Sequence, residues 1–132
     1  MAVAHVPISQ PLFIEIEDNI IKESIRFMYA LKAENSSEIF LFFNCRTLNG
    51  EETICTISYK KVLGIDTGYD NDMIQYIEDS QGIIWRIHTY IGPLPEWITT
   101  MPLEDIIAVP QCCVEKGYSM LLKPQVRQVQ VS

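Results

Sequence analysis

Five consecutive apolar residues, Ile39-Phe40-Leu41-Phe42-Phe43, form the most hydrophobic stretch of this 132-residue chain. Successive side chains of a strand point to opposite faces, so such a run needs apolar cover on both sides of a sheet. We therefore expect residues 38–46 to form a central strand around which the rest of the molecule packs. A chain of this length buries roughly two-thirds of its unfolded surface, which is enough for a single compact domain over residues 1–132.

The segment before this run predicts a strand and then a helix. From residue 12 to 17 the chain alternates between an apolar face and a mostly polar face, which is the period of a half-buried strand: Leu12, Ile14 and Ile16 on the first, Phe13, Glu15 and Glu17 on the second. Behind a candidate N-cap at Asp18 or Asn19, a stripe recurs at helical spacing, formed by Ile21, Ile25 and Met28. We expect an amphipathic helix that ends near Lys32. Together with residues 38–46 this predicts an N-terminal βαβ unit with parallel strands.

Asn49-Gly50 is a strong hairpin signal, because both residues tolerate positive φ. A two-residue turn pairs Phe42 with Ile57 and leaves one face of the returning strand, about residues 52–61, in solvent. A three-residue loop would instead make Cys45 and Cys55 neighbours on one face.

A second hairpin is predicted around Asp79-Ser80-Gln81-Gly82, which has the chemistry of a type I turn. It joins strands over residues 73–78 and 83–91. In this register one face carries Ile74, Tyr76, Ile83, Trp85 and Ile87, and the other carries Gln75, Arg86 and His88.

The C-terminal third of the chain has weaker secondary-structure patterns. Residues 103–109 suit a helical turn or a strand. Residues 112–114 and 118–122 predict a third hairpin around Glu115-Lys116-Gly117, and residues 125–132 predict a tail strand. Residues 1–10 read as a loose leader. The fold class we expect is α+β, with a single mixed, mostly antiparallel sheet and one main amphipathic helix in the N-terminal βαβ unit.

Charge and composition disfavour several classes of function. The net charge is −7 and no basic cluster exceeds Lys60-Lys61, which opposes nucleic-acid binding. No run reaches the roughly 18 apolar residues of a membrane span, and the N-terminus lacks a signal-peptide pattern, so we expect a cytoplasmic protein without membrane contact. Adjacent Cys112-Cys113 do not have zinc-ligand spacing, and no phosphate-binding motif is present. We expect neither cofactor nor metal.

Asp66-Thr67-Gly68, after Val62-Leu63-Gly64-Ile65, resembles the active-site tripeptide of the aspartic proteases, including the small retroviral type. The resemblance implies a dimer in which one Asp66 from each chain shares a proton with the other and activates a water. Thr67 would brace the paired loops and Gly68 would allow the tight turn. Tyr69 stands where that family usually has Ala or Ser, and the plain alternative is an ordinary polar turn.

Residues Leu31 to Asn44 resemble a helix-to-strand segment of the Clp protease proteolytic subunit. That family continues with Ser-Pro-Gly-Gly, whereas this chain has Cys45-Arg46-Thr47-Leu48. The resemblance therefore implies at most an inactive structural subunit.

The absence of a coherent catalytic set favours a non-enzymatic protein-interaction module: an inhibitor, an adaptor or an accessory subunit that binds another protein or its own copy. Exposed loop aromatics and open strand edges are frequent contact points. The candidate partner-binding residues are Pro93, Leu94, Pro95 and Trp97 in the Pro-rich segment and Val126, Val129 and Val131 in the tail. The alternatives are that Trp97 covers the core and that the tail strand pairs within its own chain.

Overall fold

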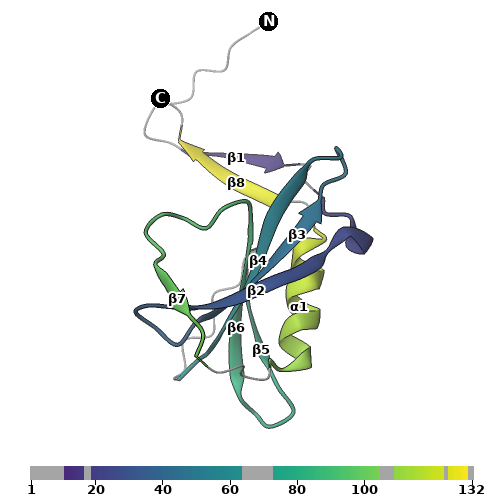
Figure 1. Cartoon of the computed structure of the whole chain (residues 1–132). Helices are drawn as coiled ribbons and strands as arrows, with labels where there is room; N and C mark the ends of the chain where they lie inside the picture. The colour runs from purple at the N-terminus through teal and green to yellow at the C-terminus, as the bar shows by residue number, and fades with distance from the viewer. Residues whose placement is uncertain (1–10, 17–18, 64–72, 105–108, 124, 131–132) are drawn as a thin grey trace, which may run out of the picture.

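The computed structural model describes residues 11–16, 19–63, 73–104, 109–123 and 125–130, with backbone pairing alone for the first and last of these ranges. Within them the fold is α+β and mostly sheet (Figure 1). The elements in chain order are β1 (Pro11–Ile16), the 3-10 turn η1 (Lys22–Ser24), β2 (Arg26–Ala33), β3 (Ile39–Arg46), β4 (Glu52–Lys61), β5 (Ile74–Glu78), β6 (Ile84–Ile91), β7 (Thr100–Pro102), α1 (Gln111–Leu121) and β8 (Gln125–Gln130).

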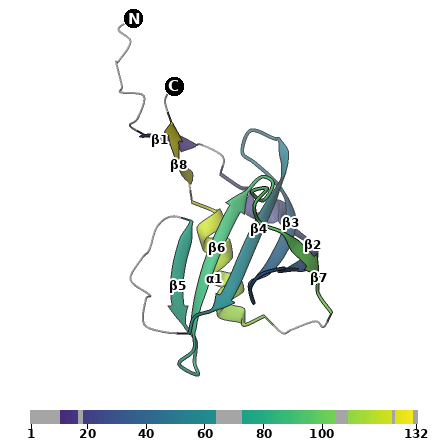
Figure 2. The ribbon, with the colours of Figure 1, turned by 90° about the vertical axis from the view of Figure 1, so that its left-hand side faces the viewer.

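Six strands form one antiparallel sheet in the order β5-β6-β4-β3-β2-β7, and β1 pairs with β8 in a separate two-stranded ribbon. Figures 1 and 2 show this ribbon beyond the C-terminal end of α1. The central strand predicted at residues 38–46 is confirmed as β3, which lies between β2 and β4. The predicted N-terminal βαβ unit is wrong, because the helix lies near the C-terminus and every described strand pair is antiparallel.

The segment predicted as an amphipathic helix forms η1 and β2 instead. Ser24 ends the helical turn early, because its Oγ donates to the Ile21 carbonyl at 2.6 Å and accepts from the Arg46 amide at 2.8 Å. The loop after β2 is short, and the Ala33 amide donates to the Glu38 carbonyl at 2.9 Å. Such a loop closes an antiparallel hairpin, whereas a parallel return would need a long crossover.

The third hairpin predicted over residues 112–122 is also wrong, because this segment is α1. Its buried residues, Cys113, Gly117, Met120 and Leu121, recur at helical spacing. Gly117 is a close-approach position here. A Cβ added to it would lie 2.5 Å from Ile57 Cγ2 and 2.9 Å from Ile57 Cδ1.

The β3–β4 hairpin forms where Asn49-Gly50 predicts it, but one residue away from the expected register. Phe42 pairs with Thr56, and the Thr47 amide donates to the Glu51 carbonyl across a three-residue loop with Gly50 at φ +83°. This loop places Cys45 and Cys55 on one face as buried free thiols, which is the alternative the sequence left open. The expectation of a half-solvated β4 is wrong, since Thr56 and Ser58 on its other face are fully buried.

The β5–β6 hairpin is confirmed, with Gly82 at φ +81° in its turn. Its faces differ from the prediction, because Ile74 pairs with His88 and Tyr76 with Arg86. A one-residue slip in register moves every side chain of a strand to the other face. Ile74 and Tyr76 therefore share the face of Arg86 and His88.

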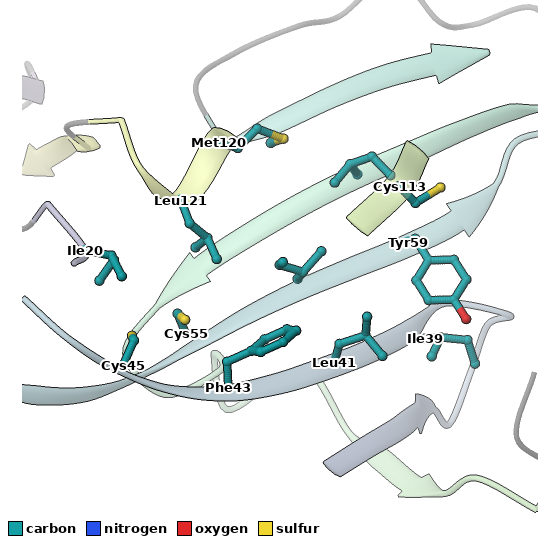
Figure 3. Close-up of a cluster of buried hydrophobic side chains, with 12 residues drawn as sticks. Ile20, Ile39, Leu41, Phe43, Cys45, Cys55, Tyr59, Cys113, Met120 and Leu121 are labelled. Atoms are coloured by element: carbon teal, nitrogen blue, oxygen red, sulfur yellow. The ribbon is translucent and has the colours of Figure 1, made fainter. Parts of the chain in front are cut away.

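The main core lies between the sheet and α1, on what we call the helix face (Figures 2 and 3). Its buried members are Ile20, Ile39, Leu41, Phe43, Cys45, Cys55, Ile57, Tyr59, Ile87, Cys113, Met120 and Leu121. A smaller cluster on the opposite face, the open face, contains Ala33, Phe40, Phe42 and Tyr90, with Leu31, Leu94 and Ile98 packed against it.

Candidate functional site

A cleft of about 510 Å³ lies on the open face of the sheet. We call it the sheet cleft. Side chains from five strands, β2 to β6, meet there with the β2–β3 loop and the segment before β7. Its lining residues are Ala33, Asn35, Ser36, Glu38, Phe40, Lys60, Ile74, Arg86, His88, Tyr90, Trp97, Ile98 and Thr99. A volume of this size is typical of sites that hold a small molecule or a short peptide segment.

An ion pair that joins distant parts of the chain lines the cleft. Arg86 Nη2 donates to both carboxylate oxygens of Glu38, at 2.9 and 3.0 Å, and Ser58 Oγ donates to Glu38 Oε2 at 2.8 Å. The Glu38 side chain is 12% exposed and that of Arg86 is 28% exposed. A carboxylate held by a guanidinium and a hydroxyl in a partly buried setting is fixed in place rather than free to rotate.

His88 and Tyr90 form a second polar pair in the cleft, with 2.8 Å between His88 Nδ1 and the Tyr90 hydroxyl oxygen. Burial lowers the pKa of His88 to about 4, with the nearby Arg86 acting in the same direction and Glu38 opposing it. Burial raises the pKa of Tyr90 to about 12. Both groups are therefore uncharged near neutral pH.

The charged residues that line the cleft in the described part of the chain carry a net positive charge. Lys60 and Arg86 each contribute one positive charge, Glu38 contributes one negative charge, and His88 is neutral. The local balance of about +1 contrasts with the net charge of −7 of the whole chain. In addition, Arg86 Nε is buried without a hydrogen-bond partner in the described structure, so Glu38 does not satisfy the whole guanidinium.

Trp97 stands at the cleft with 79% of its surface exposed. It does not cover the core as the alternative interpretation expected. The segment that holds it is fixed from below, because Leu94 and Ile98 pack on the open-face cluster and the Ile98 amide donates to the Pro95 carbonyl at 3.0 Å. Of the predicted contact residues in this segment, Pro93 and Trp97 are exposed, whereas Leu94 and Pro95 are partly buried.

The other predicted sites are placed only in part. Asp66, Thr67, Gly68 and Val131 lie outside the described residues. Within β8, Val126 is paired with Glu15 and Val129 with Leu12, so the tail strand uses one edge for pairing with β1 of its own chain. The segment likened to the Clp subunit begins in a strand rather than a helix, since Leu31–Ala33 belong to β2.

A second hollow, of about 470 Å³, lies on the helix face beside α1. We call it the apolar groove. Its lining residues are Phe27, Tyr29, Ala30, Ile39, Leu41, Phe43, Tyr59, Leu103, Val109, Val114 and Tyr118. The groove carries no charged side chain among these residues. It borders the part of β2 that precedes the pairing of Leu31–Ala33 with β7.

Reactive groups are remote from the sheet cleft. The thiols of Cys45 and Cys55 are buried on the helix face, and the hydrogen bond between them lowers the pKa of Cys45 and raises that of Cys55. Within the described ranges, no group of three or more His, Cys, Asp or Glu side chains is arranged to hold a metal ion.

Sequence reasoning placed Arg86 and His88 on one face but missed their partner Glu38 and the neighbouring Lys60. The available signal was alternation: charged or polar side chains recur every second residue at positions 58 and 60 and at positions 86, 88 and 90. In a sheet that is buried on both faces, such a series marks a polar site.

Searches against family models, curated proteins and solved structures found no match for this chain. In the described part of the structure, no helix has the length and apolar character that crossing a membrane requires.

Proposed function

We propose that this protein is a non-enzymatic protein-interaction module that binds a short peptide segment of a partner in the sheet cleft. The observation that carries the proposal is an exposed Trp97 beside a cleft lined by hydrogen-bonding side chains. Exposed tryptophans at the rim of a pocket are frequent anchors of protein interfaces, because their rings bury a large area with few rotatable bonds.

The chemistry of the lining residues favours binding over catalysis. An effective general base has a pKa near the working pH, whereas the pKa of His88 is about 4. The Glu38 carboxylate is already held by Arg86 and Ser58, and no cysteine lines the cleft. These groups are suited to hold a ligand by hydrogen bonds and charge.

The shape of the site supports a peptide as the ligand. The cleft combines aromatic and aliphatic surface, from Phe40, Trp97 and Ile98, with polar groups from strands β4 and β6 and from the β2–β3 loop. An extended peptide places alternate side chains on the two kinds of surface. Strands β6, β4 and β3, which contribute to the cleft, each pair with a strand on both sides in the six-stranded sheet.

Selection from a displayed library of random peptides tests this proposal. We expect peptides that bind the native protein and lose at least about tenfold in affinity against Trp97→Ala, since an anchoring aromatic contributes a loss of that order. The matched control is Leu48→Ala, which removes another exposed large apolar side chain, in the β3–β4 loop, away from the cleft. Selected peptides that bind native protein and Trp97→Ala equally well would refute the proposal, as would the absence of any enrichment.

A further inference from the structure

We propose that the sheet cleft recognises a carboxylate group of its peptide ligand, next to an apolar side chain that contacts Trp97. This inference rests on the proposed function and adds the chemistry of the ligand. The carboxylate has two sources in a peptide, the C-terminus or an acidic side chain. The cleft chemistry is the same for both.

The first argument is the charge at the site. Among the described charged residues that line the cleft, Lys60 and Arg86 outnumber Glu38, in a protein that is otherwise strongly acidic. An anion that enters this cleft therefore finds attraction there and repulsion elsewhere on the surface. The local balance of about +1 matches a monoanion such as a carboxylate, whereas a phosphate group, with a charge near −2, would leave an excess of negative charge.

The second argument is that Glu38 uses only one nitrogen of the Arg86 guanidinium, which lines the cleft. Glu38 is bound through Nη2 alone, and Nε has no partner in the described structure. A guanidinium offers five N–H donors in a plane, and a second carboxylate is the group that such a fork binds best. Nε itself is buried, so a ligand in the cleft would meet the exposed part of the Arg86 side chain, which is 28% exposed, and not Nε.

The third argument is the apolar surface that lines the same cleft as Lys60 and Arg86. Trp97 presents its ring to solvent at the same cleft, with Ile98 and Phe40 also in the lining. A carboxylate bound at Lys60 and Arg86 thus places a neighbouring apolar side chain of the ligand within reach of this aromatic surface. Charge fixes the orientation of the ligand, and apolar contact provides area.

Three small probes test the inference. N-acetylphenylalanine carries a terminal carboxylate, N-acetylphenylalaninamide is its neutral counterpart, and N-acetyl-aspartyl-phenylalaninamide carries a side-chain carboxylate. Binding is followed by the indole N–H signals in nuclear magnetic resonance spectra. The Trp97 signal should shift, whereas Trp85, whose indole N–H is bonded to Asp79 at 2.9 Å, serves as an internal control.

We expect at least one carboxylate probe to bind about tenfold tighter than the neutral amide, in the millimolar range of small ligands. The tighter of the two carboxylates identifies the source. Equal binding of all three probes, or no shift of Trp97 by either carboxylate up to about 10 mM, would overturn the inference.

Charge variants make the test independent of the choice of probe. Lys60→Gln should weaken carboxylate binding about fivefold or more, and Glu38→Gln should strengthen it, because the competing negative charge is gone. The control is Lys32→Gln, an exposed lysine on β2 that does not line the cleft. Equal effects of Lys60→Gln and Lys32→Gln would contradict the inference.

The two proposals can fail separately. If displayed peptides depend on Trp97 but bind equally well to native protein and Lys60→Gln, carboxylate recognition is refuted and the interaction function stands. If no displayed peptide depends on Trp97, the proposed function itself is refuted.

Discussion

Replacing Gly117 by alanine tests how closely α1 lies on the sheet. The added methyl group would stand 2.5 Å from Ile57 Cγ2 and 2.9 Å from Cδ1, closer than side-chain carbons approach. Ile57 is 1% exposed, and the close packing of protein interiors opposes movement of its side chain. Overpacking of this kind costs about 1–3 kcal/mol, and the higher helix propensity of alanine returns up to about 1 kcal/mol. We therefore expect Gly117→Ala to lower the free energy of unfolding by about 1–2 kcal/mol.

Urea denaturation followed by circular dichroism measures this change. Ser119→Ala, at an exposed position of the same helix, is the control and should be neutral or slightly stabilising. In an Ile57→Ala background the clash is removed, so the cost of Gly117→Ala should vanish or reverse, with a coupling of about 1–2 kcal/mol between the two sites. A Gly117→Ala protein that is as stable as the native one or more stable would refute the close approach.

Three further predictions concern single side chains. First, the pKa of His88 is about 4 against an ordinary value of 6.5, so the unfolded chain takes up a proton at higher pH than the folded one. The free energy of unfolding should therefore fall by about 3 kcal/mol from pH 7 to pH 4. Urea denaturation of His88→Gln at a series of pH values should lack that part of the pH dependence. Second, hydrogen bonds from the Trp85 indole and from the Ile83 and Gln81 amides lower the pKa of Asp79. Asp79→Asn should therefore lower the urea midpoint at pH 7, and the difference in midpoint between variant and native protein should shrink below about pH 4. A difference in midpoint that stays constant with pH would contradict this. Third, Asp66→Asn should leave Trp97-dependent peptide binding unchanged, whereas loss of a self-cleavage seen at mildly acid pH would favour the aspartic-protease interpretation.

The elements that were predicted correctly each have a sequence pattern that lies within one strand or one turn. The run Ile39–Phe43 demands cover on both faces, and β3 has it. Asn49-Gly50 and Asp79–Gly82 each supply a residue that tolerates positive φ, and both turns form.

Two predictions were wrong, the N-terminal helix and the third hairpin, because the sequence patterns there suit both a helix and a strand. Three apolar residues from Ile21 to Met28 are too few to separate a helical stripe from an irregular entry into a strand, and the short loop that follows decides for a hairpin. Gly117 suggested a turn, although the actual reason for glycine there is contact with Ile57. That contact joins residues 60 positions apart, which no local pattern records.

The candidate site was predicted only at its rim. Trp97 was identified because aromatic residues on loops are favoured as interface anchors, and it is exposed. The ion pair between Glu38 and Arg86 depends on the registers of β3, β4 and β6, and a slip of one residue separates them by the thickness of the sheet. Two registers predicted from the sequence were off by one residue, so the polar centre of the cleft could not be assembled from sequence alone.

The central claim is that ligands bind on the open face of the sheet and not beside α1. Mapping of amide and side-chain resonances with a peptide selected by display tests it most directly. The account predicts shifts at Trp97, Lys60 and His88 in the sheet cleft and none at Val114 or Tyr118 in the apolar groove. Shifts concentrated in the groove, with the cleft unchanged, would contradict the account.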